Sequence, residues 1–263
     1  MVEKETKVIE MELPRPKVLN IEGLSFDDWS VSIDFTNSII HIDNLKYSFR
    51  GIAGSGVYLG KIDVRHEFLD NVFALQRYIT AKRYGTIRSL ITNLIYRVKN
   101  DEFNAYFAIP LALGMAIVIR HYPELREADV ITFIPAHHSE YRNLTFHNKP
   151  CKYRRDEEEF PVKVQHMEFI AYLVHVFAEK PLVQAFAKKK AFKMKDKTLA
   201  ERREVVKEAY SIIETSIDDL KEKRVIIIDD IYTTGTTLNY CAMLLKTIAG
   251  SKRVYGVVAG RAY

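Results

Sequence analysis

Two adjacent aspartates, Asp229 and Asp230, follow a run of apolar residues and precede four threonines grouped around one glycine. The segment reads VIIIDDIYTTGTT over residues 225–237. Neighbouring carboxylates repel each other when both are ionised, so hydrogen-bond donors or cations must lie close to them. The vicinal hydroxyl groups of a sugar are such donors, and Mg²⁺ is such a cation. The acid pair therefore indicates a site for a hydroxyl-bearing ligand.

The turn that follows has the composition of a phosphate-binding loop. A glycine lets the backbone approach an anion without a Cβ atom in the way, and threonines add hydroxyl donors to the backbone N–H groups. The residues concerned are Thr233, Thr234, Gly235, Thr236 and Thr237. The lysine of the P-loop pattern GxxxxGK[ST] is missing. Helix capping, worth about 1 kcal/mol, explains one Asp or Thr at a helix start but not this whole group. The pattern predicts binding of a sugar phosphate.

The surrounding elements predict an α/β fold with a parallel sheet that is flanked by helices. Strands are expected within 128–138, 210–213, 223–230 and 252–260, and the first of these reads as fully buried. Helices are expected as a pair within 68–99 and then over 105–122, 164–179, 198–210 and 236–249. Strands that alternate with helices form parallel sheets with right-handed crossovers, and ligands bind beyond the carboxyl ends of such strands. The acid pair and the threonine turn occupy such a position.

The chain divides into three parts by composition. Residues 1–18 contain two prolines and mixed charge, and we expect a mobile lead-in there. Residues 19–66 contain short β-branched and aromatic runs separated by Asn and Gly, which predict a small β-rich appendage of antiparallel strands. Residues 67–263 are expected to form the α/β domain.

Composition also limits the classes of function. No run of about 18 apolar residues and no signal sequence is present, so we expect a cytoplasmic protein without a membrane span. Only two cysteines, Cys151 and Cys241, are present, which excludes a disulfide framework and a four-cysteine zinc module. Residues 180–207 hold ten Lys/Arg and three Asp/Glu, an excess that attracts phosphates or nucleic acid. The lysine-rich segment 188–197 is left open as a lid or as a nucleic-acid contact.

The motif VIIIDDIYTTGTT resembles the phosphoribosyl-pyrophosphate (PRPP) binding motif of type I phosphoribosyltransferases. Within that superfamily the chain resembles the ComF group over about residues 80–263. The further motifs, in the order of that group, are LIYRVK (94–99), ADVITFIPAHH (128–138), LAERREVVKEAY (199–210) and RVYGVVAGRAY (253–263). The four-cysteine zinc module usual in ComF proteins is replaced here by the β-rich appendage.

The resemblance implies roles for particular residues. Asp229 and Asp230 would be the catalytic acid pair that holds the ribose hydroxyls, and Thr233 to Thr237 would bind the 5′-phosphate. The pyrophosphate would contact Ala136, His137 and His138. The charge of the basic segment adds Lys190 and Arg202 as further candidates for this contact. Mg²⁺ would be chelated chiefly by the pyrophosphate of the substrate, with a further contact to Asp229 or Asp230 through water. No residue is expected to bind a metal by itself.

The implied reaction is displacement of pyrophosphate at the anomeric carbon of PRPP by a nitrogen nucleophile. The ComF group is linked to DNA uptake and nucleotide reuse, but the nitrogenous acceptor cannot be read from this sequence. Two alternatives stay open: a PRPP-sensing, nucleic-acid-associated protein without transferase activity, and a conventional purine or pyrimidine salvage phosphoribosyltransferase. Type I relatives commonly form homodimers, so a homodimer is also expected.

Overall fold

The computed structural model describes residues 8–12, 30–34, 39–42, 45–48, 60–63, 65–79, 90–100, 103–136, 141–146, 149–150, 152–155, 158–161, 163–190 and 198–262. His137 and His138, for which pyrophosphate contacts were predicted, lie outside these residues. The lysine-rich segment is described only over 188–190.

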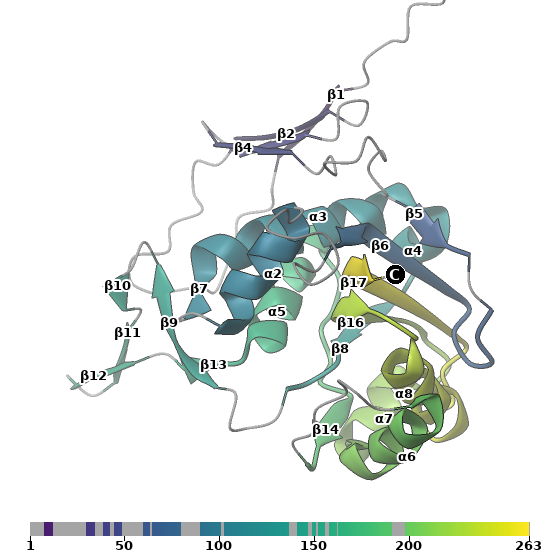
Figure 1. Ribbon diagram of the computed structural model, residues 1–263. Helices are drawn as coiled ribbons and strands as arrows, with labels where there is room; N and C mark the ends of the chain where they lie inside the picture. The colour runs from purple at the N-terminus through teal and green to yellow at the C-terminus, as the bar shows by residue number, and fades with distance from the viewer. Residues whose placement is uncertain are drawn as a thin grey trace, which may run out of the picture.

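A five-stranded, mainly parallel sheet forms the centre of the fold (Figure 1). In spatial order its strands are β5 (Gly60–Ile62), β6 (Asn71–Tyr78), β17 (Arg253–Ala262), β16 (Arg224–Tyr232) and β8 (Val130–Phe133). The last four run parallel to one another, and β5 pairs antiparallel with β6 at the edge. The predicted α/β fold with a parallel sheet is therefore confirmed, and β16 lies inside the sheet between β17 and β8.

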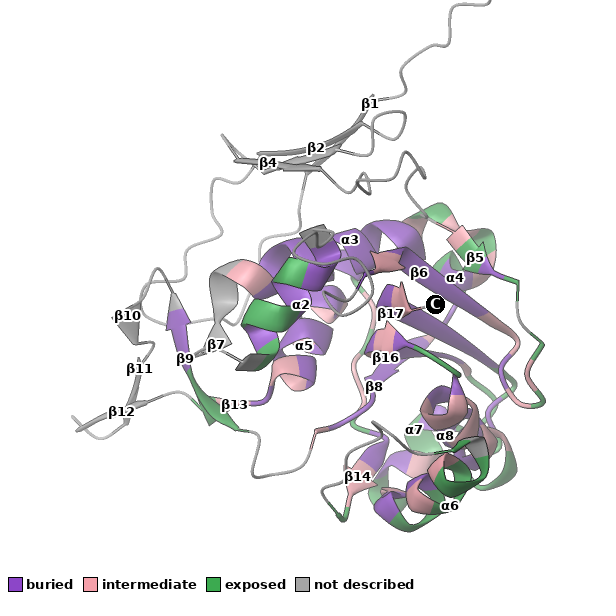
Figure 2. Ribbon diagram, in the orientation of Figure 1, coloured by how far each residue is buried: buried purple, intermediate pink, exposed green. Residues whose placement is uncertain are grey.

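Helices cover both faces of this sheet, which explains why its strands are continuous apolar runs. One face carries α2 (Leu90–Asn100), α3 (Ala105–His121) and α5 (His166–Ala178), and the other carries α6 (Leu199–Ala209) and α8 (Thr236–Thr247). Figure 2 shows the central strands as mostly buried. Within the described part of the chain, no helix combines the length and apolar character needed to cross a membrane.

Alternate residues of β16 supply the two cores. Ile226 and Ile228 pack toward α2, α3 and α5, whereas Val225 and Ile227 pack toward α6 and α8. All four side chains are fully buried. Because side chains of a strand alternate between the faces, the strand's next two residues, Asp229 and Asp230, are directed toward opposite layers.

The prediction of two helices within 68–99 is half wrong. Residues 90–100 form α2, but Asn71–Tyr78 is the strand β6 and pairs with β17 over its whole length. Its apolar run is buried on both faces, so it lacks the alternation that marks an ordinary strand and can be mistaken for a helix by periodicity. Asp70 fixes the start of the strand by accepting hydrogen bonds from the Arg253 guanidinium at 2.6 Å and the Val254 N–H at 2.8 Å.

The N-terminal part contains a separate antiparallel sheet of four strands. These are β1 (Val8–Glu12), β2 (Ser30–Asp34), β3 (Ile39–Ile42) and β4 (Leu45–Ser48), paired in sequence order. Strands β2, β3 and β4 lie within 19–66, the segment for which a β-rich appendage is predicted. Strand β1, however, belongs to the segment expected to be a mobile lead-in, and β5 belongs to the central sheet although it precedes residue 67.

Short strands add structure around the central domain. The polar stretch after β8 contains β9 (Arg142–Phe146), which pairs with β7 (Phe103–Asn104), β10 (Lys149–Pro150) and β13 (Lys163–Val164). A separate hairpin joins β11 (Lys152–Arg155) to β12 (Glu158–Pro161). Strand β14 (Phe186–Lys188) pairs with β15 (Tyr210–Ile212). This last pair matters for the site because it carries Lys188 and Tyr210.

Candidate active site

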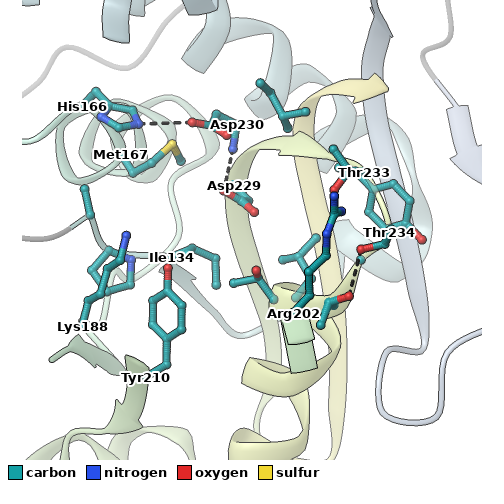
Figure 3. Close-up of a pocket in the computed structure, with 18 of the residues that line it drawn as sticks. Ile134, His166, Met167, Lys188, Arg202, Tyr210, Asp229, Asp230, Thr233 and Thr234 are labelled. Carbon is teal, nitrogen blue, oxygen red and sulfur yellow. Dashed lines mark hydrogen bonds and ion pairs between the residues drawn. The ribbon is translucent and has the colours of Figure 1, made fainter. Parts of the chain in front are cut away.

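A cavity of about 310 Å³ opens at the carboxyl ends of β16 and β8 (Figure 3). Its lining comprises Lys99, Ile134, Pro135, Ala136, His166, Met167, Lys188, Arg202, Tyr210 and the whole segment 229–238. The acid pair and the threonine turn therefore line one cavity, as the sequence predicted. The remaining lining residues come from α2, α5 and α6, from β14 and β15, and from the segment 134–136 that follows β8.

Asp230 faces the layer of α2 and α5, where it forms an ion pair with Lys99 and a hydrogen bond with His166. The Lys99 ammonium group contacts Asp230 Oδ2, and His166 Nε2 lies 3.2 Å from the same oxygen. Burial alone would raise the pKa of Asp230, but Lys99 and His166 together hold it below its usual range. Burial would lower the pKa of Lys99, and Asp230 instead keeps it above its ordinary value. Asp230 is therefore an ionised carboxylate with two fixed partners.

Asp229 has the opposite electrostatic state. Its Oδ1 accepts a hydrogen bond from the Asp230 backbone N–H at 2.9 Å. Burial, and then the negative charge of Asp230, raise the pKa of Asp229 to about 8. At neutral pH the pair therefore carries one negative charge, because two adjacent buried carboxyls do not both ionise without further cations. The two neighbouring aspartates are tolerated because they point to opposite sides of the strand and the negative charge lies on Asp230.

The threonine turn joins β16 to α8. Gly235 is the N-cap residue of α8 with φ of 71°, and no side chain caps the helix there. Thr236 and Thr237 form the first turn of the helix, and the Thr234 and Thr236 hydroxyl groups lie 2.8 Å apart. Backbone N–H groups at a helix start carry partial positive charge and bind anions. The predicted phosphate turn thus has the geometry of a helix N-terminal anion site, with hydroxyl donors around it.

The loop before β6 packs directly behind this turn. His66 Nε2 forms a hydrogen bond of 2.6 Å with the Tyr232 hydroxyl group, and the Phe68 N–H donates to Asn239 Oδ1 at 3.1 Å. A Cβ atom at Gly235 would lie 2.6 Å from the His66 ring and 2.7 Å from the Tyr232 ring. Glycine is therefore required at this position both by its φ angle and by its neighbours.

The residues predicted for pyrophosphate lie in different places. Ala136 lines the cavity, but its N–H already donates to Gln165 Oε1 at 2.9 Å. Arg202 also lines the cavity, and in Figure 3 its side chain runs toward Thr233, at the turn end. Lys190 is not among the lining residues, and its ammonium group pairs with the exposed Glu208 at 3.0 Å.

Three charged or titratable lining residues had no assigned role in the sequence-based site. Lys99 is the last residue of the LIYRVK motif, and Lys188 is the first residue of the lysine-rich segment. Each of them therefore had a weak indication, in the sequence, of a role in the site. His166 belongs to a group of four histidines and one cysteine within 137–166 whose spacing fits no standard metal site, and only the packing of α5 brings it to β16. Lys188 lies apart from Arg202 in Figure 3, with its ammonium group 5.7 Å from the centre of the Tyr210 ring.

The donor set does not fit a metal bound by the protein alone. In the described ranges, no group of three or more His, Cys, Asp or Glu side chains is placed to hold a metal ion. Oδ2 of Asp230 is already in contact with the Lys99 ammonium group.

Comparisons with known proteins agree with the motif. Residues 169–258 match the family model described as "Phosphoribosyl transferase domain". A comparison with curated protein sequences gives no match.

Two solved structures are similar at low identity. One is described as the allosteric regulatory enzyme of purine biosynthesis, with 18% identity and a TM-score of 0.33 over 57% of this chain and 25% of that chain. The other is the glutamine PRPP amidotransferase from B. subtilis complexed with ADP and GMP, with 17% identity and a TM-score of 0.35 over 58% and 26%. The match spans about a quarter of the length of each of them. The residues that match the family model, 169–258, include the acid pair and the threonine turn.

Proposed function

We propose that this protein is a phosphoribosyltransferase of the ComF group, which binds PRPP as its Mg²⁺ complex and transfers the ribosyl phosphate to a nitrogen nucleophile. One observation carries the proposal: the acid pair and the helix N-terminal turn line the same cavity at the end of β16. The link of that group to DNA uptake would place the reaction in nucleotide reuse.

The acid pair supports binding of a vicinal diol. Contacts within the described part of the protein use Oδ1 of Asp229 and Oδ2 of Asp230. One oxygen of each carboxyl group then remains for a ligand. Two acceptor oxygens on adjacent residues match in number the two hydroxyl groups of a ribose ring. The charged and neutral states of the pair would both suit this role, since either can form a hydrogen bond with a hydroxyl group.

The two ends of the substrate would meet different groups. The 5′-phosphate would bind the N–H and hydroxyl groups of 233–237, with Arg202 as the nearby cation. The pyrophosphate would lie toward the end of β8 with Lys188, which lines the cavity in place of the predicted Lys190. Because the Ala136 N–H is already bonded, Lys188 and the magnesium ion of the substrate would supply most of the positive charge there.

The reaction that follows is a substitution at the anomeric carbon. The bond from this carbon to the pyrophosphate oxygen breaks, and its electron pair leaves with the pyrophosphate. The lone pair of the nitrogen nucleophile forms the new bond, and the nitrogen loses a proton. The transition state resembles an oxocarbenium ion, as in other glycosyl transfers. Asp229 and Asp230 would orient the ring hydroxyls and stabilise the developing positive charge.

Calorimetry with Mg²⁺-PRPP tests the proposal. The double variant Asp229→Asn/Asp230→Asn should bind PRPP about a hundredfold more weakly, because each amide keeps only one acceptor oxygen and the charge-assisted hydrogen bond from the ionised Asp230 is lost. The matched control is Asp218→Asn/Asp219→Asn, an adjacent acid pair that is exposed on α7 (Ile217–Leu220) and outside the cavity. It should bind as the wild type does.

Pyrophosphate release, measured with a panel of purine, pyrimidine and amine acceptors, tests the transfer itself. Release with at least one acceptor, dependent on the acid pair, is the expected result. Absence of PRPP binding by the wild-type protein, or unchanged binding by the acid-pair variant, would contradict the proposal.

A further inference from the structure

Three elements of the fold meet at one carboxylate oxygen. Lys99 from α2 and His166 from α5 both contact Oδ2 of Asp230 at the end of β16. Asp230 is buried, with 8% of its surface exposed. A carboxylate in such a place normally takes up a proton or is neutralised by partners. Here two basic side chains from different helices contact Oδ2 of Asp230. Neither of them contacts Oδ1 of the same carboxylate.

The contact also fixes the direction of the Asp230 side chain. A carboxyl group held at one oxygen by two donors cannot rotate without breaking both bonds, each of which is charge-assisted and strong in a buried site. The low pKa of Asp230 agrees with a carboxylate that stays ionised in this arrangement. The result is a preoriented acceptor rather than a mobile one.

We propose that Lys99 and His166 are positioning residues for sugar recognition: they hold Oδ2 of Asp230 and thereby direct its Oδ1 toward a ribose hydroxyl group. This inference rests on the proposed binding of PRPP and adds to it the residues that select the hydroxylated sugar. Lys99 and His166 act through Asp230 and do not themselves contact the sugar.

The position of His166 strengthens the argument. It is the first residue of α5, and the preceding Gln165 accepts the hydrogen bond from Ala136 at the end of β8. One helix start therefore fixes both the acid pair and the neighbouring strand end. Gln165 is 2% exposed, so this arrangement lies inside the protein and not at its surface.

A pair of ligands isolates the effect of the hydroxyl groups. Ribose 5-phosphate carries them, whereas tetrahydrofurfuryl phosphate keeps a ring and a phosphate but lacks them. The affinity of each is measured by competition with PRPP. For the wild type, the ratio of the two affinities measures how much the hydroxyl contacts contribute. Lys99→Met should reduce the affinity for ribose 5-phosphate about tenfold and leave that for tetrahydrofurfuryl phosphate within about twofold.

Further variants separate positioning from a general effect on the fold. Lys99→Arg retains the charge and should stay within about threefold of the wild-type affinity for both ligands. His166→Asn should also lower the ratio of the affinity for ribose 5-phosphate to that for tetrahydrofurfuryl phosphate, by a smaller factor than Lys99→Met does. The matched control is Lys246→Met, because Lys246 pairs with Asp70 at 2.8 Å away from the cavity. It should lower the melting temperature and leave the ratio unchanged.

The outcomes distinguish the two proposals. If the wild type binds PRPP but Lys99→Met leaves the ratio unchanged, the positioning role is wrong while the proposed function stands. Equal losses for both ligands would show that Lys99 serves the phosphate or the fold, and would also overturn the inference. If Lys99→Met does not fold, His166→Asn carries the test, and failure of both variants to fold would make the contact structural only. If the wild type binds no PRPP, the proposed function fails first.

Discussion

At the scale of single residues, the acid pair shows how sequence neighbours can differ in chemistry. Asp229 and Asp230 have the same side chain, but the strand directs them to opposite layers of the protein. Asp230 contacts two basic groups, which lower its pKa and keep it ionised. The pKa of Asp229 is raised by burial and by the negative charge of Asp230. The difference arises from the partners that tertiary packing supplies, and it has a measurable consequence for stability.

Replacing Asp229 by Asn should stabilise the ligand-free protein, and increasingly so between pH 5 and pH 8. The pKa of Asp229 is about 8 in the folded protein, far above its ordinary value, so the folded state binds one proton more than the unfolded state in this window. Stability from this group therefore falls as pH rises, by at most about 1.4 kcal/mol per pH unit, and Asn removes that loss.

Urea unfolding of both proteins at several pH values measures the difference in the free energy of unfolding. Asp219→Asn is the control, because Asp219 is exposed and should show no pH-dependent difference. A difference for Asp229→Asn that stays constant or shrinks from pH 5 to pH 8 would contradict the assigned protonation state.

At the scale of elements, the turn between β16 and α8 depends on a neighbour that is distant in sequence. The loop carrying His66 lies behind Gly235 and is hydrogen-bonded to Tyr232 and, through Phe68, to Asn239. The proposed anion site is therefore shaped by β5, β6 and the loop between them as well as by its own residues. This explains why the glycine is needed here for space and not only for its backbone conformation.

Gly235→Ala and Gly250→Ala should separate these two requirements. Both glycines have positive φ, 71° and 70°, so alanine at either position costs about 1 kcal/mol of strain. At Gly250 a Cβ atom meets only Lys221 Cγ at 3.8 Å, whereas at Gly235 it overlaps the His66 and Tyr232 rings. Gly235→Ala should therefore cost about 3 kcal/mol in total and weaken PRPP binding at least about tenfold.

Thermal unfolding and PRPP titration of the two variants provide the measurement. Gly250→Ala should bind PRPP as the wild type does. Equal destabilisation by both substitutions would show that the contact with His66 and Tyr232 relaxes at no cost, and that only the backbone conformation matters at Gly235.

At the scale of the whole molecule, the sequence predicted best what depends on local signals. The strand, acid pair, glycine turn and helix of 224–247 follow one another in the chain, and the structure brings them together as expected. Strand β6 was missed because a doubly buried run lacks periodicity. The partners of Asp230 were missed because Lys99 and His166 reach it only when α2 and α5 pack on the same face of the sheet, which no local pattern encodes.

The cavity joins both helical layers, so a ligand that spans it should protect both from amide hydrogen exchange. PRPP would contact the turn at the start of α8 and, through Asp230, the α2 and α5 layer. At a hundred times its Kd it should slow exchange through global unfolding about a hundredfold. Local protection is expected at 233–237 and at the start of α5 together.

Inorganic phosphate, the matched control, should protect 233–237 alone, because it cannot reach Asp230 from the turn. Hydrogen exchange measured by mass spectrometry resolves these segments. Protection confined to the turn with PRPP as well would mean that the substrate does not engage the acid pair.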